Sequence, residues 1–156
     1  MMTDLSDILG ANAIDAALAV SSKKALFQQL AVAGSRSTGL DPKLIVAALS
    51  EREKTGSTGF GGGVAIPHGR VAGIERIAGY FARLGAPLQY LAVDLMPVDL
   101  VFMLLSPPDA GADHLKALAR VSRMMRDKAI LAKLRGARSR DALYAVLTGA
   151  ETRDAA

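Results

Sequence analysis

The chain has 156 residues, no cysteine and a formal charge of +4. This length is typical of one compact domain, and the apolar content of 51% is enough to build a core. The absence of cysteine excludes disulfides, thiolate metal ligands and a cysteine nucleophile. A basic chain can bind nucleic acid, but here the basic residues are spread along the sequence and interleaved with acids. We therefore expect no nucleic-acid partner.

Neither end of the chain nor its interior predicts a membrane segment. The N-terminus, Met1 to Ile8, lacks the basic segment and apolar run of a signal peptide. The most apolar stretch, Leu95 to Leu105, is interrupted by Pro97 and Asp99 and is too short to cross a bilayer. We expect a soluble, cytoplasmic protein without membrane insertion.

Two helices are predicted before the first glycine-rich segment. Ser21 or Ser22 can cap a helix that ends near Thr38-Gly39, because apolar residues recur there at helical spacing. Asp41-Pro42 is a second helix start, with an N-cap acid and a proline in the first turn. This second helix carries Arg52 near its end.

Strands are predicted in the middle of the chain. The glycine cluster from 56 to 63 excludes a helix, and residues 64–66 are expected to be extended before Pro67. A strand is predicted over 74–84. A second strand over 98–105 is almost continuously apolar, so we expect it to lie centrally with both faces covered.

Helices are predicted again after the strands. Caps between Asp109 and Asp113 predict a helix over 114–126, followed by helices over 128–134 and 139–147. The apolar stripe expected on the first of these consists of Leu115, Leu118, Val121, Met124 and Met125. The predicted fold class is α/β, with helices leading and a small mixed β-sheet flanked by helices on both faces. A single domain is expected over 1–150, with a disordered tail over 151–156.

His68 is the strongest candidate for chemistry. It follows the glycine-rich segment and a proline, at the end of an extended piece, and loops on a rigid scaffold often present reactive side chains. Neutral imidazole is nucleophilic near pH 7, and convergent backbone N–H groups of a glycine-rich turn stabilise anionic oxygens. These features predict a histidine that accepts a phosphoryl group in an anion-binding loop.

Other residues are candidates for supporting roles. Arg52 can supply a planar guanidinium to phosphoryl oxygens. Ser57, Thr58 and the backbone of Gly59 can supply hydroxyl and N–H donors that bind the phosphoryl group. His114 lies in the expected first turn of a helix, where the N-terminal partial charge favours anions. Its position alone is equally compatible with a second site residue and with a simple polar residue near a cap.

Other common motifs are absent from the sequence. The glycines are not followed by the Lys-Ser/Thr of a Walker A loop, and they lack the strand-before-helix context of a dinucleotide fingerprint. Two distant histidines without cysteine do not form a zinc site, and no Gly-x-Ser-x-Gly elbow is present. We expect no metal and no cofactor.

Two sequence blocks resemble a known family. The segment from Glu51 to Gly69, EREKTGSTGFGGGVAIPHG, closely resembles the phosphorylation-site signature of fructose/mannitol-type IIA components of the bacterial phosphoenolpyruvate-dependent phosphotransferase system. The segment from Pro97 to Ala119, PVDLVFMLLSPPDAGADHLKALA, matches the same family at the right distance. The second block and the length look most like its nitrogen-regulatory branch.

The resemblance implies roles for individual residues. It implies that His68 is phosphorylated on Nε2, that Arg52 and His114 line the site, and that the Ser57-Thr58 turn lies nearby. The implied donor is a small histidine phosphocarrier protein, itself charged by a phosphoenolpyruvate-dependent enzyme I. One departure is Gly62, where the family often has Asn. Loss of that side-chain amide predicts a less rigid loop.

Three functions are compatible with these observations. The leading hypothesis is a regulatory phosphoryl carrier, a phosphotransferase component whose phosphorylation state selects partner proteins such as a sensor kinase, a transporter or a transcription factor. The second is a transport component that passes phosphate to a sugar-specific IIB, with the same site residues. The third, of another class, is a binding module that uses the fold without phosphorylation.

Overall fold

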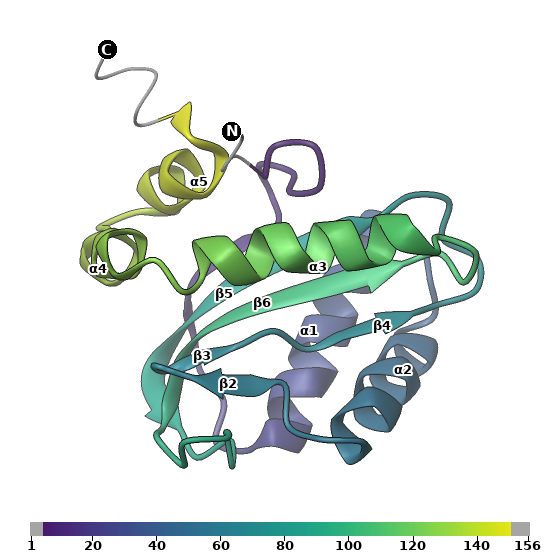
Figure 1. The fold of residues 1–156 in the computed structure, drawn as a ribbon, viewed down its shortest axis with the longest axis horizontal. Helices are drawn as coiled ribbons and strands as arrows, with labels where there is room; N and C mark the ends of the chain where they lie inside the picture. The colour runs from purple at the N-terminus through teal and green to yellow at the C-terminus, as the bar shows by residue number, and fades with distance from the viewer. Residues whose placement is uncertain (1–4, 151–156) are drawn as a thin grey trace.

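The computed structural model describes residues 5–150, which form one mixed sheet covered by helices on both faces (Figure 1). The strands are β1 (Ile14–Leu18), β2 (Gly59–Gly61), β3 (Val64–Ala65), β4 (His68–Arg70), β5 (Ala78–Leu88) and β6 (Val98–Ser106). The helices are α1 (Lys23–Thr38), α2 (Pro42–Lys54), α3 (Ala112–Met124), α4 (Lys128–Gly136) and α5 (Arg140–Thr148). The predicted fold class is confirmed.

Strand β6 organises the sheet. The order is β1-β5-β6-β3-β2, with β4 also paired to β6. Strand β5 lies antiparallel to β6, whereas β3 and β4 lie parallel to it. Every residue of β6 except Asp99 is buried, which confirms the prediction of a central strand with both faces covered. Side chains alternate across such a strand, so β6 contributes to two cores.

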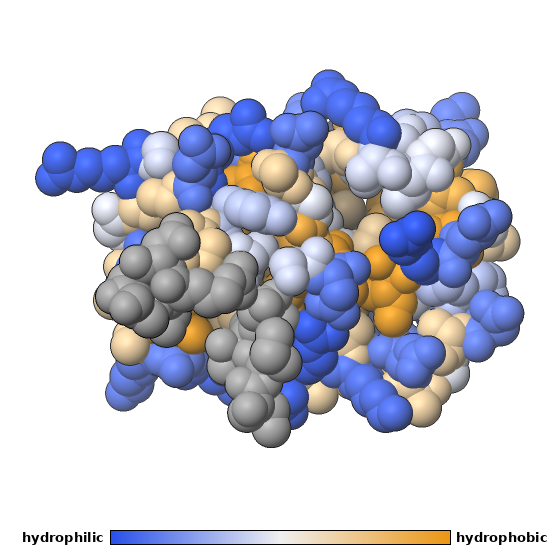
Figure 2. Space-filling model, turned by 90° about the horizontal axis from the view of Figure 1, so that it is seen from above, coloured by the Kyte–Doolittle hydropathy of each residue, from blue (hydrophilic) through white to orange (hydrophobic). Residues whose placement is uncertain are grey.

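The two cores lie on opposite faces of the sheet. One contains Val101, Met103 and Leu105 of β6 together with apolar residues of α1 and α2. The other contains Leu100 and Phe102 with apolar residues of α3, α4 and α5. Burying this apolar area is the dominant favourable term in folding. Figure 2 views the face covered by α3, α4 and α5, where separate apolar areas lie between hydrophilic residues.

The helix boundaries follow local capping chemistry where capping side chains are present. The side chains of Ser22, Asp41 and Ser139 accept hydrogen bonds from backbone N–H groups in the first turns of α1, α2 and α5. Helix α1 ends at Gly39, which adopts the left-handed conformation with φ of 78°. These starts and this end were predicted correctly.

The differences from the prediction include a missed strand and the bounds of β5 and α3. Strand β1 precedes α1, so helices do not lead the chain; this short strand pairs in parallel with the distant β5 and contacts α5. Strand β5 covers 78–88 rather than 74–84, because its extent follows pairing with β6. Helix α3 begins at Ala112 after Gly111 and has no side-chain cap, so the acids between 109 and 113 do not set its start.

Two predictions concern the ends of the chain, which lie partly or wholly outside residues 5–150. The expected tail over 151–156 lies outside the described residues, as do residues 1–4 of the N-terminal segment. Between residues 5 and 150, no helix has the length and apolar character needed to cross a membrane.

The turn between β2 and β3 is anchored from two directions. The N–H of Gly62 donates to the carboxylate of Asp94 at 3.0 Å, and the Gly62 carbonyl accepts from the Arg135 guanidinium at 2.8 Å. Arg135 also forms a bidentate pair with Asp99. The backbone of Gly62 is therefore held by side chains from outside the turn.

We expect Gly62→Asn to change the free energy of unfolding by less than about 0.5 kcal/mol, because Asn tolerates a left-handed backbone and surface changes are usually small. Gly62 has φ of 69° and open space where a Cβ would stand. The matched variant is Gly63→Ala, whose Cβ would meet Arg135 at 2.6 Å with φ of 84°. It should cost at least about 1–2 kcal/mol. Urea unfolding checks both values, and equal losses would contradict this account.

Candidate functional site

His68 is held at the beginning of a strand between two helices. It opens β4 and pairs with Leu104 of β6, and the preceding Pro67 carbonyl accepts a hydrogen bond from Leu104 at 3.0 Å. Its side chain lines an open groove between α2 and α3 and is 9% exposed overall. The sheet therefore fixes the backbone of His68, while the groove leaves its ring accessible.

Two hydrogen bonds determine where the His68 ring carries its proton. Nδ1 lies 2.7 Å from the carbonyl oxygen of Ile66. A carbonyl only accepts, so Nδ1 carries the proton. On the other side of the ring, Nε of Arg52 donates to Nε2 of His68 at 3.2 Å, which requires a lone pair on Nε2. Both contacts specify the same neutral tautomer, whose Nε2 is the nucleophilic nitrogen.

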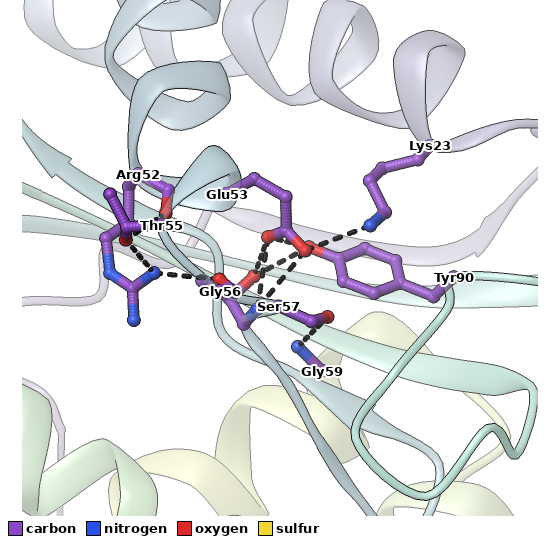
Figure 3. A network of polar contacts seen from close by, with 9 residues as sticks. Lys23, Arg52, Glu53, Thr55, Gly56, Ser57, Gly59 and Tyr90 are labelled. Atoms are coloured by element: carbon purple, nitrogen blue, oxygen red, sulfur yellow. Dashed lines mark hydrogen bonds and ion pairs between the residues drawn. The ribbon is translucent and has the colours of Figure 1, made fainter.

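Arg52 is oriented by the end of its own helix. Its Nη1 donates to the hydroxyl of Thr55 at 2.9 Å and to the carbonyl of Gly56 at 2.8 Å. Figure 3 shows the guanidinium beside these two acceptors, at the turn that follows α2. The guanidinium is thereby directed with its Nε toward His68.

His114 lies close to His68 from the opposite helix. It is in the first turn of α3, and the two imidazole centroids are 5.7 Å apart. Its Nδ1 lies 2.6 Å from the hydroxyl of Ser106, the last residue of β6. The structure therefore brings together Arg52, His68 and His114 from α2, β4 and α3.

The pKa of both histidines is lowered. Burial is the main cause for His68, and the positive charge of Arg52 lowers it further, against the opposing effect of the Ile66 carbonyl. Burial is also the main cause for His114, followed by the charges of Arg70 and His68. Burial disfavours the charged imidazolium, so both rings are neutral at pH 7.

The groove around the histidines has apolar sides. It is lined by Leu44, Ala47 and Ala48 of α2 and by Leu115 and Leu118 of α3, together with the site residues. Leu44 is 51% exposed and Leu115 is 62% exposed. The prediction that Leu115 belongs to the buried stripe of its helix is therefore wrong. His114 takes the buried position instead, because the helix turns that face toward β6.

The predicted phosphoryl-binding turn makes its hydrogen bonds within the protein. The Thr58 hydroxyl donates to the carboxylate of Glu53 at 2.5 Å and contacts the hydroxyl of Tyr90 at 2.7 Å. The N–H of Gly59 donates to the hydroxyl of Ser57 at 3.1 Å. Ser57, Thr58 and Gly59 do not line the groove of His68. Their binding of a phosphoryl group remains a prediction.

Sequence reasoning missed several residues that shape the site. Ser106, which contacts His114, ends a long apolar run and gave no signal of its own. Glu53 and Tyr90 pair across a separation in the chain that no local pattern predicts. Arg70 lies two residues after His68 and lines the same groove. Among residues 5–150, no three potential His, Asp or Glu ligands gather as a metal site would require.

The fold and the three converging side chains define a phosphotransferase-type IIA domain. The family model described as "Phosphoenolpyruvate-dependent sugar phosphotransferase system, EIIA 2" matches residues 7–150. The chain belongs to this family, which confirms the resemblance of its two sequence blocks.

Within the family, the chain is similar to nitrogen regulatory proteins. It is 48% identical over 143 residues to a nitrogen regulatory protein of Bradyrhizobium diazoefficiens, covering 92% of this chain and 94% of that protein. The crystal structure of nitrogen regulatory protein IIA-Ntr from Neisseria meningitidis matches with a TM-score of 0.86 and 38% identity, covering 91% of this chain and 97% of that one.

The similarity extends to sugar-specific members at the level of fold. Enzyme IIA for mannitol from Escherichia coli, solved in complex with phosphorylated enzyme IIB, matches with a TM-score of 0.76 at 17% identity. The match covers 91% of this chain and 99% of that one. At this identity the comparison establishes a shared fold alone.

We expect Arg52→Ala to raise the pKa of His68, because the variant removes a positive charge that disfavours the imidazolium and also exposes the ring. An NMR titration of the His68 ring protons measures the change. The control is Arg138→Ala, which removes an exposed guanidinium elsewhere and should leave the titration unchanged. An unchanged His68 titration in Arg52→Ala would contradict the observed contact.

We expect stability to fall as the solution is acidified below pH 6.5. Both histidines have folded pKa values below the ordinary 6.5, so the unfolded chain binds more protons in this range. Their contribution is fully present above pH 6.5 and is lost as the pH falls through the folded pKa values. Urea unfolding between pH 7.5 and 5.5 measures the slope. Replacing both histidines with Gln should flatten it, whatever the absolute stability of the variant.

Proposed function

We propose that this protein is a phosphoryl carrier that accepts phosphate on Nε2 of His68. The observation that supports this most directly is the tautomer: Nδ1 is committed to the Ile66 carbonyl, so Nε2 holds the lone pair beside an arginine and an open groove. Phosphoryl transfer needs little covalent help from the protein beyond positioning and charge stabilisation. The site has residues for both.

The proposed step transfers the group between two imidazoles. The P–N bond on the donor's phosphohistidine breaks as the Nε2 lone pair of His68 forms a new P–N bond. The donor nitrogen recovers its electron pair, and the proton on Nδ1 of His68 stays in its bond to Ile66. No oxidant, metal or further cofactor enters this balance.

Two residues are proposed to stabilise the transferred group. Before transfer, Nε of Arg52 donates a hydrogen bond to the lone pair on Nε2 of His68. We propose that it moves onto the phosphoryl oxygens, where guanidinium geometry suits paired acceptors. His114 is proposed to donate from Nε2 when the Ser106 hydroxyl donates to its Nδ1, a tautomer that the 2.6 Å contact allows.

The proposed donor is a small histidine phosphocarrier protein charged by a phosphoenolpyruvate-dependent enzyme I. The half-exposed Leu44 and Leu115 on either side of the groove support docking of a protein rather than of a small phosphate ester. Apolar contacts around a central reactive group are typical of protein interfaces. Membership of the family is compatible with the same donor.

We propose that the role is regulatory. The relatives with the highest identities given above are named nitrogen regulatory proteins. A phosphoryl group adds negative charge at the groove, which alters a docking surface through repulsion and new hydrogen bonds. Regulated partners would be proteins such as a sensor kinase or a transporter. The cysteine-free composition suits a reducing compartment, so we propose the cytoplasm.

A sugar-transport role is the second candidate. It rests on the shared fold with a mannitol IIA solved with its phosphorylated IIB. The same His68 chemistry would serve both roles, and only the acceptor would differ. Restored sugar phosphorylation in a strain lacking a sugar IIA would favour transport over regulation. A binding module without phosphorylation has weaker support, because Arg52, His68 and His114 line the same groove.

Incubation with phosphoenolpyruvate, enzyme I and the phosphocarrier should add the mass of one phosphoryl group, as measured on the intact protein. His68→Ala should abolish the increment, because Nε2 is lost. His114→Ala should keep the increment but form it more slowly, since the acceptor nitrogen remains. A control with Arg138→Ala should behave as the wild type. An increment that survives in His68→Ala would overturn the assignment.

A further inference from the structure

A second polar cluster lies behind Arg52, on the other side of the turn that follows α2. This Glu53 cluster consists of Lys23, Glu53, Thr58 and Tyr90 (Figure 3). The Glu53 carboxylate accepts from the Thr58 hydroxyl at 2.5 Å, from the Thr58 N–H at 3.1 Å and from Lys23 Nζ at 2.9 Å. The Tyr90 hydroxyl also donates to it at 3.2 Å.

Most of the cluster is buried, with the Lys23 side chain its most exposed part at 26%, and its donors all point at the Glu53 carboxylate. Thr58 is 5% exposed, Tyr90 is fully buried and the Glu53 side chain is 10% exposed. Burial alone would raise the pKa of Glu53, but the hydrogen bonds from Thr58 and Lys23 outweigh it and leave that pKa lowered. Burial raises the pKa of Tyr90, so its phenol stays a donor. The donors therefore converge on one ionised carboxylate.

The same turn links this cluster to the guanidinium of Arg52. The Gly56 carbonyl accepts from Arg52 Nη1 at 2.8 Å. The Gly56 N–H donates to the Glu53 carbonyl at 3.2 Å, and two residues later Thr58 is bound by the Glu53 carboxylate. Glu53 thus holds Gly56 through its backbone carbonyl and Thr58 through its carboxylate. Figure 3 shows Arg52 and Glu53 extending to opposite sides of this turn.

We propose that the Glu53 cluster positions Arg52 for phosphoryl transfer at His68, by fixing the Gly56 carbonyl that orients the guanidinium. This inference rests on the proposed function. Glu53, Thr58 and Tyr90 do not touch the groove, so they are positioning residues rather than catalytic ones. Small displacements of a group that must meet a transition state are costly, on the order of a hundredfold in rate for about 1 Å.

The test uses Thr58→Val, which removes the hydroxyl but keeps the shape and every charge near the site. The variant leaves the charged and titratable groups around the two histidines in place. These are Arg52 and Glu53 of α2 near His68, and Arg70 of β4 and His68 itself near His114. The matched control is Thr38→Val, because the Thr38 hydroxyl also donates and accepts one hydrogen bond each, but at the end of α1.

The first readout is the titration of His68 in the unphosphorylated protein. Thr58→Val should raise the pKa of His68 toward the value that His68 has in the Arg52→Ala variant. The reason is that Arg52, once displaced from His68, no longer disfavours the imidazolium. In the Arg52→Ala background, Thr58→Val should add no further shift. Thr38→Val should leave the titration unchanged. Should Thr58→Val fail to fold, Tyr90→Phe removes the other hydroxyl of the cluster and takes its place.

The second readout is the rate of phosphoryl acceptance from the phosphocarrier. Thr58→Val should slow it about tenfold or more, and the slowing should disappear in the Arg52→Ala background. An unshifted His68 titration, or the same slowing with and without Arg52, would overturn the proposal and leave the cluster a purely structural anchor. If no variant, wild type included, accepts a phosphoryl group, the proposed function fails, while the titration still decides whether the cluster positions Arg52.

Discussion

The site depends on the pair of hydrogen bonds that hold the His68 ring between the Ile66 carbonyl and Arg52. A free neutral imidazole exchanges its proton between two nitrogens, but here the carbonyl commits that proton to Nδ1. The nucleophilic lone pair therefore always lies on Nε2. The Ile66 carbonyl can do this because Pro67 and the pairing of β4 with β6 hold the backbone of His68 extended.

The positive charge of Arg52 serves two purposes that follow from its position. Before transfer it helps burial to keep His68 neutral, since a second positive charge beside it is disfavoured. In the proposed transfer the same charge would be in place to stabilise anionic oxygens, so little reorganisation would be needed when charge arrives. An arginine so close to its target needs precise anchoring, which the turn after α2 and the Glu53 cluster supply.

The sheet and helices place reactive and apolar groups next to one another. Strand β6 is buried on both faces and carries β4 on one side, while α2 and α3 enclose the groove at the end of that pair. His114 takes the inward position on α3, which turns Leu115 outward beside the reactive ring. A histidine in a core position of α3 thus leaves apolar surface exposed at the groove where we propose that a partner protein docks.

The sequence by itself determined the family, the helix starts at Ser22, Asp41 and Ser139, and the central strand. These features rest on local signals: capping side chains, apolar runs and a long motif. Tertiary structure alone decided the rest. Strand β1 depends on pairing with the distant β5 and on contact with α5, and the outward turn of Leu115 depends on how α3 meets β6. The contact of Arg52 with His68 and the contact of Tyr90 with Glu53 join residues far apart in the chain, where no local pattern records them.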